Sequence, residues 1–337
     1  MTAPSLSALL VCPGDFASVR NTVRHLAAQD VADRIELVVV TPNTAGVSCA
    51  LAGMTAFAGI NVVEAPATRS IGHGYAVGVR AASAPVVVLT EDHSFPHPDW
   101  ARHLLVRHEE HWAVVAPLMC NANPANLVSW ADMLLGYGPW MDPAAGGERE
   151  HLPGHNSSYK RDALLAFGDR LEGLLEAESV LHWEMRGRGM RLYQETAART
   201  DHTNFALLGS WTRLQFHGGR VFAAARAQPW GFAKRMAFAL ASPLIPFVRL
   251  LRTLRSLNGS RSVPSCVRWR VVPLLFYGLV LDGVGQGLGY AFGAGRSCER
   301  VARYEFDRFE HVLPADRARI LDGNDSPATG SLPAEAI

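Results

Sequence analysis

The feature that most constrains this chain is a short apolar run, Val86–Leu89, that passes directly into a polar turn. Three valines and a leucine in succession predict a strand buried on both faces of a parallel sheet. Residues 91–93 (Glu-Asp-His) follow, and then Pro96 and Pro98, neither of which fits a central strand. Because open α/β folds bind ligands at the carboxyl ends of their strands, this turn is a candidate ligand site. Its oxygens and imidazole suit Mn²⁺ or Mg²⁺ in contact with phosphate oxygens.

A lone acidic tripeptide after a strand is equally consistent with an ordinary polar turn. The interpretation therefore depends on the order of the features on either side. Short apolar runs rich in β-branched residues recur along the chain and predict further strands at Leu6–Cys12, Ile35–Val40, Val62–Val63, Val114–Pro117 and Met190–Tyr193.

Helical patterns alternate with these runs. A helix capped by Ser18 is expected after the first strand, and others at Gly72–Ala82, Asn123–Leu135, Lys160–Phe167 and Leu171–Arg188. Strands that alternate with helices over short connections predict an α/β fold with a doubly wound, mostly parallel sheet flanked by helices.

Composition is that of a globular chain, with 337 residues, 48% hydrophobic and 19% charged. The five cysteines lie far apart and show no zinc-site or redox spacing, which favours a reducing compartment. The N-terminus has no basic region followed by a long apolar core, so we expect no signal peptide.

The net charge of +1 conceals a strong asymmetry. Residues 202–281 contain eleven Lys and Arg but no Asp or Glu, whereas residues 1–201 hold 22 acidic and 15 basic side chains. A solvated face normally mixes both signs, so the basic stretch suggests a surface that meets anionic lipid or a polyanionic substrate.

Two apolar segments lie in this basic part. Met236–Val248 is interrupted by prolines and is too short to cross a bilayer, but it suits an interfacial or re-entrant helix. Val271–Gly295 is longer and glycine-rich, and either a full span or a membrane-dipping hairpin fits it. We therefore expect a domain at residues 1–228, a basic, apolar, membrane-associated helical region at 229–320, and a disordered tail at 321–337.

Taken together, the motifs of residues 5–226 resemble, in their order, the inverting glycosyltransferases of family 2, which have the GT-A fold. Pro13-Gly14-Asp15 stands where that family ends its first strand in Pro-x-Tyr/Phe-Asn. Val40-Thr-Pro-Asn-Thr44 replaces its Val-Asp-Asp-x-Ser, and Gly72–Gly78 is similar to its small-residue helix. The resemblance implies a donor site that comprises Pro13, Gly14, Asp15, Asn43, Arg69, Gly72, Glu91 and Asp92.

The metal motif Asp-x-Asp of the family falls on Glu91-Asp92-His93, and His202 resembles a later ligand to the same cation. The resemblance thus implies Mn²⁺ or Mg²⁺ bound by Glu91, Asp92, His93 and His202. Ala177–Leu181 and Gly189–Leu192 match the pattern that carries the catalytic base, which places that base at Glu178, with Glu176 as its nearest rival. His155, Asn156 and Trp183 are implied on the acceptor side.

The resemblance implies a metal-dependent, hexosyltransferase-like enzyme that moves a sugar from a nucleotide-sugar donor to a hydroxyl acceptor. The expected acceptor is lipid- or polyprenyl-linked, in cell-surface glycan or glycolipid synthesis at the cytoplasmic face of a bacterial-type cell membrane. No nucleic-acid partner is expected. Gln-x-x-Arg-Trp, the motif of processive members, is missing near Phe216–Arg220. A non-catalytic GT-A scaffold in a glycan-assembly complex and a nucleotidyltransferase are the alternatives.

Overall fold

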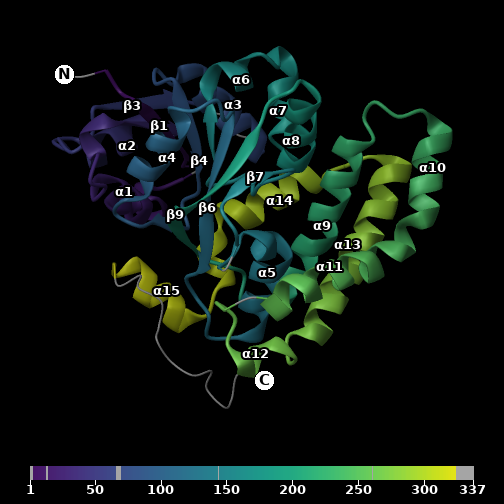
Figure 1. Ribbon diagram of the computed structural model, residues 1–337. Coiled ribbons are helices and arrows are strands. Elements are labelled where there is room, and N and C mark those ends of the chain that lie inside the picture. The colour runs from purple at the N-terminus through teal and green to yellow at the C-terminus, as the bar shows by residue number, and fades with distance from the viewer. Residues whose placement is uncertain (1–2, 13, 66–69, 143, 260, 324–337) are drawn as a thin grey trace. The chain divides into compact units, whose positions relative to one another are not determined.

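The computed structural model describes residues 3–12, 14–65, 70–142, 144–259 and 261–323 (Figure 1). The chain divides into two compact units. The first comprises residues 1–119 and 145–201, and the second comprises residues 120–144 and 202–337. Each unit is described by itself.

Nine strands in the described part of the chain form one mixed sheet in the order β3-β2-β1-β4-β8-β6-β9-β5, with β7 paired to β9. Strands β1 to β4 are mutually parallel, while β8 runs antiparallel to both β4 and β6. The strands are β1 (Leu6–Val11), β2 (Ile35–Thr41), β3 (Gly59–Glu64), β4 (Val86–Thr90), β5 (Ser94–Pro96), β6 (Val114–Asn121), β7 (Gly147–Arg149), β8 (Ser158–Lys160) and β9 (Leu192–His202). The predicted mostly parallel α/β sheet is confirmed.

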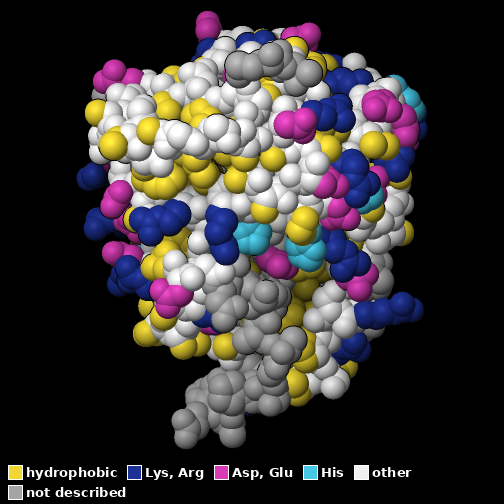
Figure 2. All heavy atoms as spheres, turned by 90° about the vertical axis from the view of Figure 1, so that its left-hand side faces the viewer, with side chains coloured by type: hydrophobic (Ala, Val, Ile, Leu, Met, Phe, Trp, Pro, Cys, Tyr) yellow, Lys and Arg dark blue, Asp and Glu magenta, His cyan; other side chains and the backbone are white. Residues whose placement is uncertain are grey.

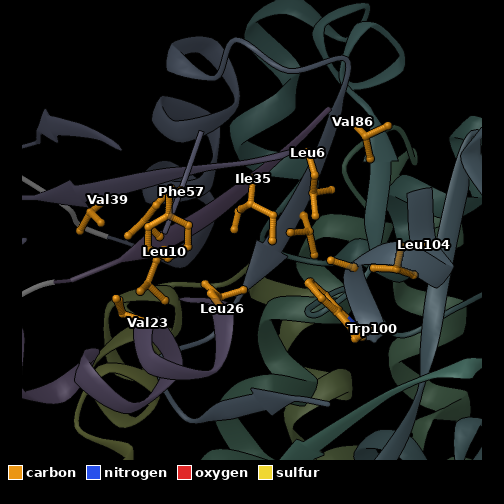
Figure 3. Packing of buried hydrophobic residues seen from close by; sticks show 14 of the residues in the cluster. Leu6, Leu10, Val23, Leu26, Ile35, Val39, Phe57, Val86, Trp100 and Leu104 are labelled. Carbon is orange, nitrogen blue, oxygen red and sulfur yellow. The ribbon is translucent and has the colours of Figure 1, made fainter. Parts of the chain in front are cut away.

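The core of the first unit lies against β1, β2 and β4, all of whose residues are buried. Figure 3 shows Leu6 and Leu10 of β1 beside Ile35 of β2, with Leu26 and Trp100 from two helices packed on them. Apolar side chains on both faces of these strands explain why the continuous valine-rich runs were readable from sequence.

The helices of the first unit connect or cover these strands (Figure 1). They are α1 (Arg20–Ala27), α2 (Thr44–Leu51), α3 (Ile71–Ala81), α4 (Trp100–His108), α6 (Arg161–Leu165), α7 (Leu171–Leu174) and α8 (Glu178–Gly187). The predicted Ser18 cap is wrong, because Val19 precedes α1 without a capping side chain. Asp15 caps a short 3₁₀ turn there instead, accepting from the Ala17 N–H.

The helix predicted at Leu171–Arg188 is in fact two helices. α7 ends at Leu174 and α8 begins at Glu178, so Glu176 lies in the connection between them. Gly189, with φ +80°, follows the end of α8 as expected for a left-handed C-terminal residue. The break places Glu178 in the first turn of a helix rather than in the middle of one.

The second unit is helical in its described part. Its helices are α5 (Leu127–Tyr137), α9 (Leu208–Arg226), α10 (Phe232–Ala241), α11 (Ile245–Gly259), α12 (Ser265–Arg268), α13 (Val272–Phe292), α14 (Ser297–Phe306) and α15 (Pro314–Leu321). α13 packs along α9 and contacts α10 and α11. A Cβ on Gly285 would lie 2.1 Å from the Phe216 carbonyl oxygen, so this glycine of α13 permits backbone contact with α9.

Two helical stretches of the second unit are long and apolar enough to cross a membrane, by length and composition only. They are Phe232–Leu257, of which 11% of the apolar window is buried, and Val272–Phe292, of which 44% is buried. The prediction that the segment around Met236–Val248 is too short to span does not hold, because α10 and α11 are joined by a 3₁₀ turn (Ser242–Leu244) into 26 residues. Residues 324–337 of the predicted tail lie outside the described residues.

Candidate functional site at the carboxyl edge of the sheet

The parallel register brings three strand ends to one edge of the sheet. Val11 pairs with Val40, and Leu10 pairs with Thr90, so β1, β2 and β4 end side by side. The polar residues that follow these ends are Asp15, Asn43 and the 91–93 turn. The edge predicted as a ligand site is therefore shared by all three segments.

The candidate donor residues after β1 and β2 are exposed and shape their loops. Gly14 and Asp15 follow β1, and Asp15 caps the 3₁₀ turn. Asn43 caps α2 by accepting from the Gly46 N–H at 3.1 Å. The other two candidates in this group, Pro13 and Arg69, lie outside the described residues.

A threonine of α1 holds the turn after β4. The Thr22 hydroxyl lies 3.2 Å from the Glu91 carbonyl oxygen, 2.8 Å from that of Asp92 and 3.1 Å from that of Ser94. Thr22 is fully buried. The single hydroxyl proton of this buried side chain is shared among three carbonyl groups, of which that of Asp92 is the nearest, and this contact holds the bend against α1.

Glu91 is buried at this turn and is surrounded by donors. Its Oε2 accepts from the Ser94 hydroxyl at 3.0 Å and from the Asn156 side-chain amide at 2.7 Å. Its Oε1 lies 2.6 Å from His155 Nδ1. Burying a carboxylate is costly without such partners, and this one is compensated by hydrogen bonds from its own turn and from the loop before β8.

His155 joins Glu91 to Glu178. Its Nδ1 lies 2.6 Å from Glu91 Oε1, and its Nε2 lies 2.6 Å from Glu178 Oε1. Burial opposes the charged form of the ring, but the two carboxylates outweigh it and raise the pKa of His155 well above its usual value. The result is a chain of two carboxylates bridged by one imidazolium.

Glu178 keeps a face toward solvent, with 19% of its side chain exposed. Burial alone would raise its pKa, but the neighbouring His155 outweighs burial and lowers the pKa of Glu178. Gly154 packs directly on this side chain, since a Cβ there would lie 2.2 Å from Glu178 Cβ. Glycine is required at this position if Glu178 is to hold its orientation.

Asn156 has the left-handed backbone conformation, with φ +62°, that a non-glycine residue rarely adopts. Its N–H donates to the Leu89 carbonyl at 2.7 Å, and the Leu89 N–H donates to the Ser157 carbonyl at 3.2 Å. The loop before β8 is thereby fastened to the end of β4, which sets Asn156 and His155 against Glu91.

A second buried layer lies behind Glu178. The Leu152 N–H donates to His182 Nδ1 at 3.4 Å, so His182 Nε2 carries the proton and donates to the Tyr159 hydroxyl at 2.9 Å. The Tyr159 hydroxyl in turn donates to the Gly154 carbonyl at 3.2 Å. Burial lowers the pKa of His182 to about 4, so the ring is neutral at pH 7.

Glu176 has a different environment from Glu178. Its Oε1 accepts from the Gly72 N–H at 2.8 Å, at the N-terminus of α3. A Cβ on Gly72 would lie 2.5 Å from the Glu172 carbonyl oxygen, so the small residue also permits close packing on α7. A carboxylate at a helix N-terminus is favoured by the helix dipole, which gives Glu176 a structural role.

Three residues form a candidate metal set. Glu91, His93 and His202 each offer one ligand atom, and these atoms lie within 4.8 Å of one another. All three side chains are buried, and His202 is the last residue of β9. One oxygen and two imidazole nitrogens fit Mn²⁺ and related divalent cations. Asp92 contacts His93, with Oδ1 2.5 Å from Nδ1.

Trp183 lies in α8 with 41% of the residue exposed, which is unusual for tryptophan. With His155 and Asn156 it makes up the acceptor-side set named from the sequence. Of that set, His155 and Asn156 contact Glu91 directly, while Trp183 offers an exposed aromatic face of the kind that stacks on sugars.

Some residues of this site carried no sequence signal. Thr22 acts through contacts with a segment distant in the chain, which no local pattern encodes, and the contact of Gly154 with Glu178 is likewise visible only in the structure, although Gly154 lies in the stretch that resembles the acceptor-side loop. His155 was placed on the acceptor side, whereas its bridge between two carboxylates is visible only in three dimensions.

Comparisons with known proteins identify the fold of this chain but no family. No family model and no curated protein sequence matches the chain. The structure is similar to the mannosyltransferase PcManGT from Pyrobaculum calidifontis, solved with GDP-Man and Mn²⁺, at 14% identity and a TM-score of 0.54, covering 85% of this chain and 88% of that one. A weaker likeness is to TarS from S. aureus in complex with UDP, at 13% identity and a TM-score of 0.45, covering 85% of this chain and 90% of that one. Another is to GalNAc-T7 with UDP, GalNAc and Mn²⁺, at 12% identity and a TM-score of 0.49, covering 68% of this chain and 48% of that one. The chain spans about half the length of GalNAc-T7. The architecture is therefore that of the GT-A glycosyltransferases.

Proposed function

We propose that this protein is an inverting glycosyltransferase that moves a sugar from a nucleotide-sugar donor to a hydroxyl acceptor. The observation that carries the proposal is the chain Glu91–His155–Glu178. It connects the carboxyl edge of a GT-A sheet to a carboxylate at the start of α8 whose side chain is 19% exposed. The chemistry needs an anion-binding edge and a base within reach of an incoming alcohol, and both are supported here.

The donor is assigned to the edge formed after β1, β2 and β4. Gly14, Asp15 and Asn43 follow the first two strand ends, and Glu91 and Asp92 follow the third. Gly72 is the weaker member of this set because its N–H is already bonded to Glu176. We keep Pro13 and Arg69 in the proposal on the sequence resemblance.

A divalent cation, Mn²⁺ or Mg²⁺, fits the set Glu91, His93 and His202. When bound, such a cation offsets the negative charge that develops on the departing diphosphate. Asp92 is assigned to the same centre through its contact with His93.

Glu178 is assigned as the base. In the transfer, the acceptor oxygen bonds to the anomeric carbon of the donor sugar as the bond from that carbon to the diphosphate oxygen breaks. The electrons of the broken bond leave with the nucleoside diphosphate, and the hydroxyl proton passes to Glu178. His155 Nε2 is paired with Glu178 Oε1 at 2.6 Å and orients the carboxylate, so the other oxygen, Oε2, is the one we assign to the proton.

We also propose that the acceptor is lipid- or polyprenyl-linked and that the protein works at the cytoplasmic face of a bacterial-type membrane, in cell-surface glycan or glycolipid synthesis. The support is the surface of α10 and α11, where Leu240 is 83% exposed, Leu244 64% and Phe247 57%. Arg252 and Arg255 are exposed on α11 as well. Apolar side chains flanked by arginines are typical of a helix that lies in the interface of an anionic bilayer.

The test is incubation of the purified full-length protein with Mn²⁺ and a panel of nucleotide sugars, with release of nucleoside diphosphate as the readout. We expect release from one donor class, stimulated by a lipid-linked alcohol and abolished by EDTA. Product with the anomeric configuration opposite to that of the donor supports inversion. Consumption of sugar phosphates instead would favour a nucleotidyltransferase, and silence without nucleotide binding would contradict the proposal.

A further inference from the structure

The two histidines of the candidate metal set can each bind a cation through Nε2 only if the proton of the neutral ring sits on Nδ1. Which tautomer a histidine adopts is set by the partner of its other nitrogen. The partner of His202 Nδ1 is the side-chain oxygen of Asn204, at 3.0 Å. The orientation of this amide therefore decides which nitrogen of His202 faces a metal.

The amide orientation of Asn204 follows from backbone groups whose roles are unambiguous. The Asn123 N–H donates to one side-chain atom of Asn121 at 3.0 Å, so that atom must be the oxygen. The Asn204 amide faces this oxygen at 3.0 Å and also the His202 carbonyl oxygen at 3.0 Å. Only an NH₂ group can donate to both acceptors, so the oxygen of Asn204 must be the atom that faces His202.

The position of Asn204 is fixed as firmly as its orientation. Its N–H donates to Asn123 Oδ1 at 2.8 Å, and its carbonyl accepts from Asn123 Nδ2 at 2.9 Å. The Ser129 hydroxyl of α5 lies 3.2 Å from Oδ1 of both Asn121 and Asn123, so its one proton is shared between them. Asn123 and Asn204 are fully buried, so rotation of either amide would leave several buried polar groups without partners.

We propose that Asn204 is a positioning residue that holds His202 as the Nδ1–H tautomer, so that Nε2 presents its lone pair to a divalent cation. The proposal rests on the metal centre of the proposed function. The three-asparagine cluster of Asn121, Asn123 and Asn204 thereby orients His202, a role that the sequence motifs did not suggest. We assign this cluster no contact with the donor or the acceptor.

The same arrangement recurs at His93. Asp92 Oδ1 lies 2.5 Å from His93 Nδ1, and a carboxylate only accepts, so the proton lies on Nδ1 and Nε2 is the ligand atom. Asp92 is thus assigned to orient His93 rather than to bind the cation. Asp92→Asn keeps an acceptor oxygen and should retain most Mn²⁺ affinity, whereas Asp92→Leu should lose it. Equal losses in both variants would instead make Asp92 a ligand.

The tautomer can be read without metal or activity. Long-range ¹H–¹⁵N NMR spectra of the full-length protein labelled in histidine distinguish Nδ1–H from Nε2–H rings, and a His202→Gln variant identifies the His202 signals. We expect the Nδ1–H pattern in the wild type and a shift toward Nε2–H in Asn204→Leu. An Nε2–H pattern in the wild type would overturn the proposal, even if the variant failed to fold.

Mn²⁺ affinity provides the second readout, measured by electron paramagnetic resonance on the full chain without nucleotide. Loss of an outer partner typically lowers metal affinity by ~10–100-fold, so Asn204→Leu should weaken binding by that factor. The matched control is Asn126→Ala, which removes a nearby asparagine that caps α5 by accepting from the Ser129 N–H at 2.8 Å. This control should lower the melting temperature and leave Mn²⁺ affinity unchanged.

A folded Asn204→Leu protein with wild-type Mn²⁺ affinity would overturn the role of Asn204 while the metal centre stands. If instead the wild type and His202→Ala bind Mn²⁺ equally, or neither binds it, the metal centre itself is wrong. The two failures are therefore distinguishable.

Discussion

The sheet of the first unit and the helices α10 to α13 of the second place their apolar and charged residues in opposite ways. In the first unit, β1, β2 and β4 are wholly buried, and Glu91, which follows the end of β4, is buried and paired with His155. In the second, apolar side chains such as Leu240 and Phe247 are exposed, while Asp282 is buried on α13 and bonded to Arg249 at 2.6 Å.

The balance of basic and acidic residues also differs between the two regions. On the face shown in Figure 2, basic and acidic side chains are interspersed, as on an ordinary solvated surface. Residues 202–281, by contrast, carry eleven basic side chains and no acidic one. The difference teaches that the first unit buries its apolar residues in a sheet, whereas the second leaves apolar side chains exposed in a stretch of the chain that carries only basic charges, which is the basis of the proposed contact with an anionic bilayer.

The largest effect is expected at the sheet edge, where Glu178 and Glu176 can be compared directly. Glu178→Gln keeps the size of the side chain but cannot take a proton, so turnover should fall by ~10²–10⁴-fold. Glu176→Gln, the matched control, keeps an acceptor for the Gly72 N–H and should stay within a few-fold of the wild type. Donor turnover assays decide the comparison, and full activity of Glu178→Gln would remove the assigned base.

Acid should destabilise the first unit through His182. Burial lowers the pKa of His182 to about 4, below the unfolded value of about 6.5, so the unfolded chain takes up the proton first. The contribution of neutral His182 to the free energy of unfolding is complete above about pH 6.5. It is lost as the pH falls toward 4, by roughly 3 kcal/mol in all. Denaturant unfolding from pH 7 to 4.5 should show a flatter pH dependence in His182→Gln. An identical slope in the two proteins would contradict this.

The buried ion pair of the helical unit should give a smaller loss. Asp282→Ala leaves Arg249 and Gln286 without their shared acceptor. We expect Asp282→Ala to lower the free energy of unfolding by about 2–3 kcal/mol. This is less than the roughly 3–5 kcal/mol typical of breaking a fully buried pair, because the Arg249 side chain is 35% exposed. A double variant with Arg249→Met and Asp282→Asn should recover part of this loss. Chemical denaturation measures both, and additive losses would argue against coupling.

The smallest effect is expected for single changes on the exposed helical face. Leu240→Asp or Phe247→Asp should each weaken binding to anionic liposomes by roughly 10-fold, through lost apolar burial and added repulsion. The matched control is Val106→Asp on α4 of the first unit, where the side chain is 52% exposed, and it should bind as the wild type does. Liposome flotation at low and high salt is the measurement. Equal binding by all of these proteins would place the contact elsewhere.

Much of the fold could be predicted from sequence because strands buried in a parallel sheet consist of unbroken runs of apolar residues. The runs at Leu6, Ile35 and Val86 each begin a strand at the residue expected. β9 was harder, because its eleven residues form no apolar run and include charged side chains, and only its start was predicted. The division of Leu171–Arg188 into two helices leaves Glu176 in the connection, where it accepts from the Gly72 N–H of α3, a contact that no helical pattern encodes.

Candidate site residues could be named from sequence where polar side chains directly follow a predicted strand, as Glu91 and His93 do. The partners that orient these groups were not, because Thr22, Gly154 and Asn204 act across long separations in sequence. Asn204 stands only two residues after His202 in the sequence, yet its proposed role depends on its contacts with the asparagines at 121 and 123.

The most direct test of the central claim is the position of the cation. Crystals of the full-length protein soaked with Mn²⁺ and a nucleoside diphosphate should give one strong anomalous peak at the manganese edge, bonded to Glu91, His93 and His202. The diphosphate should complete its coordination, and Glu178 should face the side where an acceptor enters. A peak bound elsewhere, or a nucleotide bound away from the ends of β1, β2 and β4, would contradict the account.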